Sequence, residues 1–278
     1  MESGQPSRTA LAAAAHRAAH QILENGRIFS DRLAVPILGQ DPADVVREAE
    51  QEPSRRRMRL FIAVRTRFAE DALAHARERG AVQIVVLGAG LDTYAYRTPL
   101  GVGRVFEIDH PATQAWKRQR LAEAGIPVPP WVTFAPVDFE RETLADGLAA
   151  AGFDAAAQTF FTWLGVVPYL PEPAIWRTLE FIASLPNGAH VVFDYSDPPH
   201  ALPPDARADH DQRAARVAAL GKRWLSYLEP PQLHARLRQT GYCTIEDLGP
   251  PQIRARYFPG FAGLASDKGG HILRAATI

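Results

Sequence analysis

The chain has 278 residues, of which 46% are hydrophobic and 22% charged, as in ordinary soluble globular proteins. Lysine plus arginine equals aspartate plus glutamate at 31 each, so no net field would attract nucleic acid or an acidic membrane surface. Cys243 is the only cysteine, which excludes an internal disulfide and a cysteine-built zinc site. The length suits one large domain with a cap, and neither a metal site nor a nucleic-acid partner is expected.

The first 79 residues are predicted to form a helical cap. Helices are expected over residues 9–24, 42–50 and about 54–79, the last from apolar residues that recur every three or four positions. The alanine-rich start is interrupted by His16 and Arg17 and lacks a basic leader, so it does not predict a secretory signal.

From residue 80 onward, strand and helix patterns alternate. Short runs rich in β-branched residues are each followed by a helical stretch, which is typical of a parallel, doubly wound α/β sheet. This cofactor-binding half is expected to extend over residues 80–196. The predicted strands are 83–87, 104–109, 132–137, 157–163 and 191–195, and the helices between them are 111–124, 140–150 and 172–185.

The last third departs from this alternation. Residues 197–204 contain four prolines, and a long polar helix is predicted over 205–228, so residues 197–232 are expected to form a lid insertion. Residues 233–278 then complete the sheet of what we expect to be one domain. The elements predicted there are a helix at 231–240 and strands at 242–248 and 271–276.

No membrane partner is expected. The longest uncharged stretch of interest, residues 155–171, is interrupted by Gln158, Pro168 and Pro171, which argues against a membrane span. Together with the missing leader, this predicts a cytoplasmic protein.

A glycine motif follows the first strand of the alternating half. Residues 83–87 form a short, β-branched run that is typical of a strand buried on both faces. Gly88 and Gly90 carry no Cβ, so the backbone can turn sharply there and lie against a ligand. A dinucleotide site would need a third glycine where Thr93 stands, and Asp92 would repel a pyrophosphate but suits a cationic amino group. The motif therefore favours S-adenosylmethionine over a nicotinamide dinucleotide, with a ligand-free tight turn as the structural alternative.

Acidic residues stand at the ends of several predicted strands. The carboxyl edge of an open α/β sheet is where nucleotide-like cofactors bind, and a carboxylate there can accept hydrogen bonds from a ribose diol. Glu107 and Asp109 stand 19 and 21 residues after Gly88, both near the expected spacing of about 20. Asp138 followed by Phe139 suits an adenine amino group and base. The full set is Asp92, Glu107, Asp109, Asp138 and Asp194, and an exposed helix cap is the alternative for each.

Three segments carry a resemblance to a known family. They are VLGAGLDTYAYR at residues 86–97, VFEIDHP at 105–111 and VRTR at 64–67, and together they resemble the leucine carboxyl methyltransferase family. The resemblance implies a class I methyltransferase fold, with a mostly parallel seven-stranded sheet and a helical lid. It also implies S-adenosylmethionine as the methyl donor, and O-methylation of a small-molecule carboxylate or hydroxyl. A C-terminal protein carboxylate is a further acceptor known in the family.

By the same resemblance, roles pass to particular residues. Arg65 would hold the cofactor's carboxylate, Asp109 the ribose hydroxyls, and Asp138 with Phe139 the adenine. The remaining assignments are Gly88 and Gly90 beneath the methionine portion, with Arg67 and Glu107 as the alternatives to Arg65 and Asp109.

The acceptor side is less defined. Many family members carry a glutamate five residues before the tyrosine that matches Tyr169, and this chain has Leu164 there. That departure is the main support for a non-catalytic, cofactor-binding scaffold as the alternative function. Tyr169 and Tyr195 are candidates to line the acceptor pocket, with core packing as the alternative. No catalytic base is assigned among the candidate histidines, which are His110, His200, His210, His234 and His271.

Overall fold

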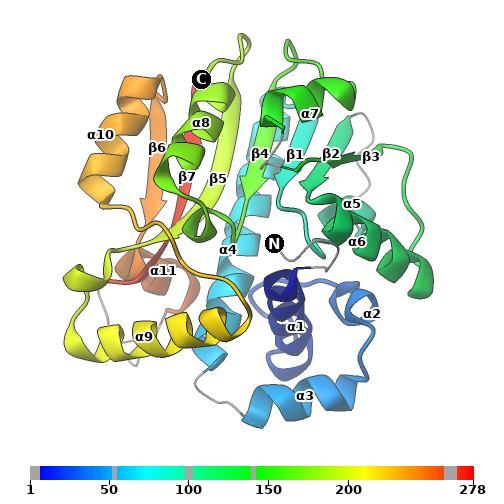
Figure 1. The fold of residues 1–278 in the computed structure, drawn as a ribbon, viewed down its shortest axis with the longest axis vertical. Coiled ribbons are helices and arrows are strands. Elements are labelled where there is room, and N and C mark those ends of the chain that lie inside the picture. Colours follow the sequence, from blue (N-terminus) through cyan, green and yellow to red (C-terminus); the bar gives the residue numbers. More distant parts are fainter. Residues whose placement is uncertain (1–6, 52–54, 98–102, 139–141, 260–267) are drawn as a thin grey trace. The chain divides into compact units, whose positions relative to one another are not determined.

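Seven strands form the sheet of the computed structural model, which describes residues 7–51, 55–97, 103–138, 142–259 and 268–278. The strands are β1 (Gln83–Leu87), β2 (Arg104–Asp109), β3 (Val132–Pro136), β4 (Thr159–Trp163), β5 (Ala189–Ser196), β6 (Thr244–Leu248) and β7 (Gly270–Ala276). Their order is β3-β2-β1-β4-β5-β7-β6 (Figure 1). β1 pairs parallel with β2, β2 with β3 and β4 with β5, whereas β7 runs antiparallel to β5 and β6. The predicted α/β fold with a mostly parallel seven-stranded sheet is confirmed.

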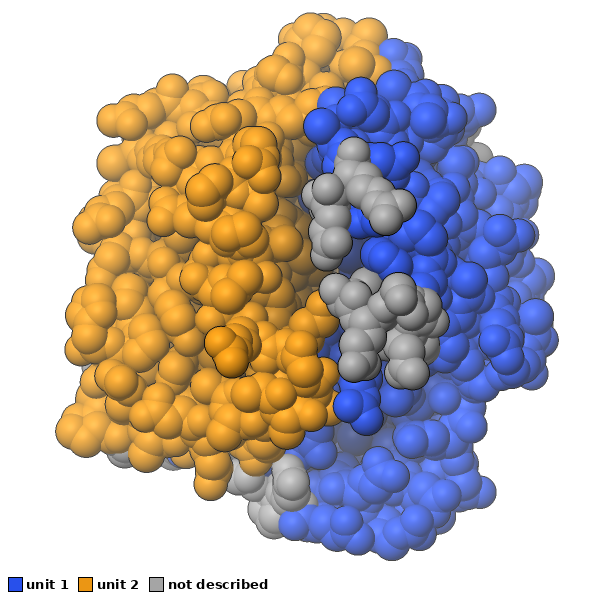
Figure 2. Space-filling model, viewed as in Figure 1, with its two compact units in different colours: residues 1–67, 82–154 blue, residues 68–81, 155–278 orange. Residues whose placement is uncertain are grey.

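The chain divides into two compact units (Figure 2). Unit 1 comprises Met1–Arg67 and Val82–Asp154, and unit 2 comprises Phe68–Ala81 and Ala155–Ile278. The long helix α4 (Arg56–Glu78) contributes to both.

Unit 1 holds strands β1 to β3 and the glycine motif. All five residues of β1 are buried, as expected for a strand covered on both faces. The helices of unit 1 are α1 (Arg8–Leu23), α2 (Ala34–Leu38), α3 (Pro42–Gln51), α5 (Tyr94–Arg97), α6 (Pro111–Glu123) and α7 (Leu144–Ala150). α6 and α7 both contact β3, while α1 packs against α2 and α3.

Unit 2 holds strands β4 to β7. β5 is buried over Ala189 to Tyr195, and α8 packs against it, with α10 against α8. The helical elements of unit 2 are η2 (Val167–Tyr169), α8 (Glu172–Ala183), η3 (Pro199–Ala201), α9 (Pro204–Ala219), α10 (Pro230–Thr240) and α11 (Pro250–Tyr257).

The helix predicted over residues 205–228 is too long. α9 ends at Ala219, and Gly221 follows in the left-handed region at φ 76°. The chain then runs as an irregular strap, defined here as residues 224–228. Leu225 N–H donates to the carbonyl of Pro168 at 2.7 Å, and Leu228 N–H to the carbonyl of Ser196 at 3.2 Å. These bonds, to a residue of η2 and to the last residue of β5, satisfy backbone N–H groups that a helix would have satisfied internally.

Other boundaries agree to within a few residues, with three omissions. The prediction missed the short helices α2 and α5 and the helix α11. The predicted start of α4 at Ser54, and of α7 at Glu140, lies outside the described residues. Within the part of the chain that the structure describes, no helix combines the length and apolar character that crossing a bilayer requires.

Candidate cofactor-binding site

The glycine loop of unit 1 is tied to the end of the neighbouring strand. After β1, Gly88 and Gly90 take φ angles of 67° and 45°, in the left-handed region that favours glycine. Ala89 N–H donates to the carbonyl of Ile108 at 3.0 Å. Gly90 N–H donates to Oδ2 of Asp109 at 2.6 Å. The loop and the end of β2 therefore form one hydrogen-bonded edge.

Asp109 is the half-buried acid at this edge. Its Oδ1 accepts the N–H of His110 at 2.7 Å, so both carboxylate oxygens receive a backbone donor. Burial raises the pKa of Asp109, while the N–H groups of Gly90 and His110 act in the opposite direction. The structure thus brings Asp109 to the glycine loop, as the ribose assignment requires.

Glu107 faces other protein groups. Its side chain is fully buried, with Lys117 Nζ 2.8 Å from Oε2 and the hydroxyl of Tyr96 donating to Oε2 at 2.9 Å. Burial raises the pKa of Glu107, against the opposing charge of Lys117. Both contacts fall on Oε2, while Oε1 is buried without a hydrogen-bond partner. Because Glu107 is completely buried, whereas Asp109 is half-buried and bonded to the glycine loop, the geometry favours Asp109 over Glu107 as the residue for a ribose.

Asp92 and Thr93 have structural partners within the loop. Oδ1 of Asp92 accepts the N–H of Tyr94 at 2.8 Å, so Asp92 orders the turn that leads into the short helix α5 (Tyr94–Arg97). The hydroxyl of Thr93 donates to Oδ2 of the buried Asp31 at 2.6 Å. A role for Asp92 toward a cationic amino group stays a prediction.

The end of β3 lies beside the end of β2. Val137 N–H donates to the carbonyl of Asp109 at 2.9 Å, and Asp138, the next residue, is half-buried. The sheet therefore brings Asp138 to the same edge as Asp109. Phe139, its expected partner toward adenine, lies outside the described residues.

Two basic residues of helix α4 were alternatives for the cofactor's carboxylate. Arg65 is half-buried and Arg67 is exposed. Arg17 on α1 was not predicted to be a site residue. It is 8% exposed and donates from Nη2 to the carbonyl of Leu91 in the glycine loop. Its sequence signal was weak, because one basic residue on an alanine-rich helix is usually solvated.

The two tyrosines assigned to the acceptor pocket lie in unit 2. Tyr169 is half-buried in η2, just after β4. Tyr195 on β5 is 2% exposed, and its hydroxyl donates to Oδ2 of Asp247. It belongs to a buried polar group that we call the His271 cluster. The members of this cluster are Tyr195, Asp197, His234, Asp247 and His271.

The candidate histidines have diverse surroundings. His110 caps α6 by accepting the N–H of Ala112, and His200 is exposed. His210 on α9 is 4% exposed, with Nε2 2.9 Å from the hydroxyl of Tyr227 on the strap and Nδ1 2.9 Å from Oδ1 of Asp211.

The segment after β4 forms an ordered turn. Leu164 is half-buried, and Gly165 follows at φ 71° with its N–H donating to Oδ1 of Asp194. Asp194, one of the strand-end acids, is 5% exposed. Its carboxylate thus orders the turn that leads into η2.

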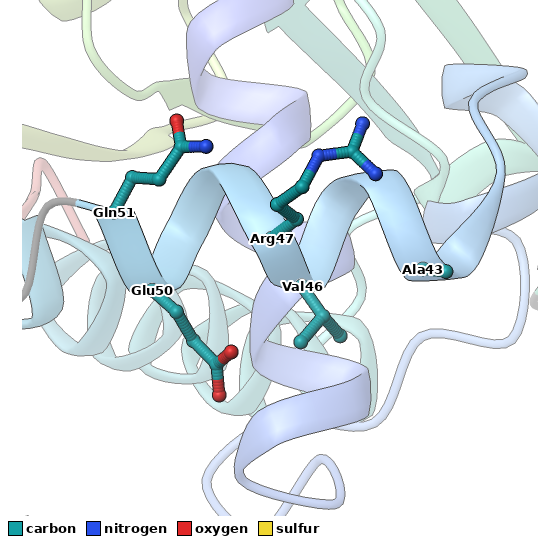
Figure 3. Close-up of a pocket in the computed structure, with 5 residues that line it drawn as sticks. All are labelled: Ala43, Val46, Arg47, Glu50 and Gln51. Atoms are coloured by element: carbon teal, nitrogen blue, oxygen red, sulfur yellow. The ribbon is translucent and has the colours of Figure 1, made fainter.

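Features elsewhere do not involve the predicted site residues. A surface hollow of about 470 Å³ lies on α3, lined by Val46, Arg47, Glu50 and neighbouring residues of that helix (Figure 3). Its arginine forms an ion pair with Asp44 at 2.5 Å. Among the described residues, no group of three or more His, Cys, Asp or Glu side chains is arranged to hold a metal ion.

Comparisons with known proteins agree with this geometry. A family model described as leucine carboxyl methyltransferase matches residues 10–183. A "Putative S-adenosyl-L-methionine-dependent methyltransferase" of Bacillus subtilis is 29% identical and covers 93% of this chain and 93% of its own. Another from Mycobacterium avium is 33% identical and covers 76% of this chain and 72% of its own.

A solved structure shares the fold. It is that of a "putative methyltransferase" from Thermobifida fusca YX, with a TM-score of 0.56 at 15% identity, and the match covers 99% of this chain and 96% of that one. The glycine loop with Asp109, the family match and these relatives point to one cofactor and decide against the nicotinamide alternative. The chain belongs to the leucine carboxyl methyltransferase family and is an S-adenosylmethionine-dependent methyltransferase.

Proposed function

We propose that this enzyme methylates an oxygen atom, of a carboxylate or a hydroxyl, on a small metabolite. The observation that carries the proposal is the family match over residues 10–183, because the family's description names a carboxyl group as the acceptor. Both acceptor classes present an oxygen to the methyl group, so they share one displacement chemistry.

The residues of unit 1 fit the cofactor. S-adenosylmethionine supplies an electrophilic methyl group on a sulfonium centre. At the sheet edge Asp109 offers a carboxylate beside the glycine loop, and the loop itself carries no side chain at Gly88 or Gly90. In addition, Nε of Arg17 is buried beside the loop without a hydrogen-bond partner, as a site for an anionic group would leave it. These groups would bind and orient the cofactor, and none of them needs to exchange a proton during methyl transfer.

Unit 2 supports an acceptor of limited size. The strap is hydrogen-bonded to the segments that leave β4 and β5, so those strand ends are covered by chain. A carboxylate acceptor is already anionic and needs no base, whereas a hydroxyl acceptor usually does. The buried His210, paired with Tyr227 of the strap, is the histidine we would test for that role.

The same proposal extends to partners and location. The equal numbers of acidic and basic residues favour a small-molecule acceptor over nucleic acid or a membrane surface. A cytoplasmic location, the expectation of the sequence analysis, is proposed with it.

The test is an acceptor screen with methyl-labelled S-adenosylmethionine. Small carboxylic acids, phenols, alcohols, amines, thiols and a peptide ending in leucine are incubated separately with the enzyme, and labelled product is counted before and after mild alkali. A methyl ester releases its label in alkali, whereas a methyl ether retains it. The proposal predicts label on a small carboxylate or hydroxyl.

Two results would overturn it. Label on the peptide alone would make the acceptor a protein, and label on amines or thiols alone would exclude O-methylation. The variant His210→Asn separates the two oxygen classes, because it should lower turnover of a hydroxyl acceptor and leave a carboxylate acceptor unaffected. The matched control is His200→Asn, which alters an exposed histidine of the same lid region.

A further inference from the structure

Helix α1 lies along the glycine loop and presents one face to it. A Cβ built on Gly90 would lie 3.0 Å from the Cβ of Ala10, near the start of the helix. Two helical turns later, Arg17 reaches the carbonyl of Leu91. The spacing of seven residues places Ala10, the buried Ala14 and Arg17 on the same side of α1. Small alanine side chains let the helix approach the loop closely, and Arg17 is the charged group that this approach buries.

The guanidinium of Arg17 has more donors than the protein uses. It carries five N–H groups, whereas the hydrogen bond that the structure gives it is the one from Nη2 to Leu91. Nε is buried and has no hydrogen-bond partner, since Oδ2 of Asp31 lies 3.7 Å away. A buried donor without an acceptor costs free energy, so an arginine kept in this state indicates an acceptor that arrives from outside the chain.

Asp31 does not supply that acceptor, because other groups already use its carboxylate. Oδ2 accepts the hydroxyl of Thr93 at 2.6 Å, and Oδ1 accepts the N–H of Leu33 at 3.0 Å. Nε of Arg97 lies 3.6 Å from Oδ1. Asp31 therefore holds Arg17 in place by charge without satisfying the donors of its guanidinium.

From these contacts we infer that Arg17 binds the carboxylate of the cofactor's methionine portion. The planar guanidinium matches a carboxylate better than any neutral group, and the pair is a charge-assisted interaction. Arg17 stands beside the residue that follows Gly90, on the loop that the cofactor must approach. The inference rests on S-adenosylmethionine as the cofactor and adds a second arginine, from α1, to the Arg65 expected from the family resemblance.

The test compares two ligands that differ in one group. S-adenosylmethionine and its decarboxylated analogue are titrated calorimetrically into wild-type protein and Arg17→Gln. The variant should bind S-adenosylmethionine about 10- to 100-fold more weakly, the loss expected for hydrogen bonds between charged groups. It should bind the decarboxylated analogue as well as wild type does.

Two further variants serve as controls for the effect of Arg17→Gln. Arg27→Gln makes the same chemical change at an exposed site and should bind both ligands like wild type. Arg17→Lys keeps the charge without the planar fork, so its loss for S-adenosylmethionine should be intermediate, and thermal unfolding of each variant checks that it is folded. Unchanged affinity for S-adenosylmethionine in Arg17→Gln would overturn the inference.

An equal loss for both ligands would also overturn it, because Arg17 would then act by shaping the loop. If wild-type protein bound neither ligand, the cofactor site itself would be contradicted. That result is distinct from a failure of the inference about Arg17 alone, in which wild type binds both ligands.

Discussion

The two units each bury a cation beside aspartates, and they satisfy it differently. In unit 2, Nδ1 of His271 lies 3.0 Å from Oδ1 of Asp247 and Nε2 lies 3.2 Å from Oδ2 of Asp197, so both ring nitrogens have carboxylate partners. In unit 1, Arg17 has one hydrogen bond, and Oδ2 of Asp31 is 3.7 Å from its Nε. The protein therefore supplies partners for both ring nitrogens of His271, but not for every N–H group of Arg17.

This difference separates a structural cluster from a binding site. Burial alone would lower the pKa of His271, but the hydrogen bonds that its ring donates to Asp197 and Asp247 raise the pKa to about 9. The cluster therefore holds a charged imidazolium that links β5, β6 and β7. Arg17, with donors left over beside the glycine loop, is prepared for a ligand instead.

The largest expected effect is on the saturated cluster. His271→Ala removes the cation that lies between two largely buried carboxylates and leaves His234 beside Asp247 and Lys268 beside Asp197. This loss should lower the free energy of unfolding by about 3–5 kcal/mol. Denaturant titration measures this, with His75→Ala, an exposed histidine of α4, as the control. A loss below about 1 kcal/mol would show that the cluster does not stabilise unit 2.

The same cluster predicts a pH dependence of stability. The pKa of His271 is raised from 6.5 to about 9. The stabilisation that charged His271 gives to the folded protein is therefore complete below about pH 6.5 and is lost as the pH rises through about 9. The pKa values of Asp197 and Asp247 are lowered, so their contributions are present above about pH 4 and are lost as the pH falls.

Wild-type protein should therefore lose up to about 3 kcal/mol between about pH 6 and pH 10 through this residue. The unfolding free energy of His271→Ala, measured over the same range, should lack this step. Parallel pH profiles for the two proteins would contradict the assignment.

A smaller effect is expected at the face between α1 and the glycine loop. Gly90→Val forces a positive φ on a branched residue and sets its side chain against Ala10. Gly125→Val imposes similar strain at φ 63° where no atom lies within 4 Å of the new Cβ. Gly90→Val should exceed this control by about 1–3 kcal/mol in destabilisation, and it alone should abolish calorimetric binding of S-adenosylhomocysteine. Wild-type affinity in Gly90→Val would refute the loop assignment.

The smallest predicted effect distinguishes the two acids of β2. Asp109→Ala should weaken S-adenosylhomocysteine binding by about 1–3 kcal/mol, through loss of hydrogen bonds to a charged group. Glu107→Gln should leave that affinity unchanged and lower thermal stability, because it breaks the buried pair with Lys117. If only the Glu107 variant bound weakly, the ribose contact would move two residues upstream.

Much of unit 1 was predictable because its signals are local. The predicted strand at 104–109 has the bounds of β2, and the strand-end spacing of Asp109 placed it at the glycine loop. The spacing alone left the choice between Asp109 and Glu107 open, and only the family resemblance favoured Asp109. The contacts of Lys117 and Tyr96 with Glu107 come from other elements and could not be read from the spacing.

The remainder depends on contacts between residues distant in the chain. Arg17 meets Leu91 across 74 positions, and Tyr195 meets Asp247 across 52, so neither partner can be read from a local pattern. The strap was predicted to continue the polar helix α9. Its actual backbone partners are Pro168 and Ser196, which lie far away in the chain and leave no signal in the local pattern.

The most direct test of the contrast is hydrogen–deuterium exchange with and without S-adenosylhomocysteine, at short labelling times. The account predicts that ligand protects the glycine loop at residues 88–93, the end of β2 and the loop-facing turns of α1. Exchange in the His271 cluster, around residues 195–197, 247 and 271, should not change. Protection centred on that cluster, with the glycine loop and α1 unaffected, would contradict the assignment of the cofactor to unit 1.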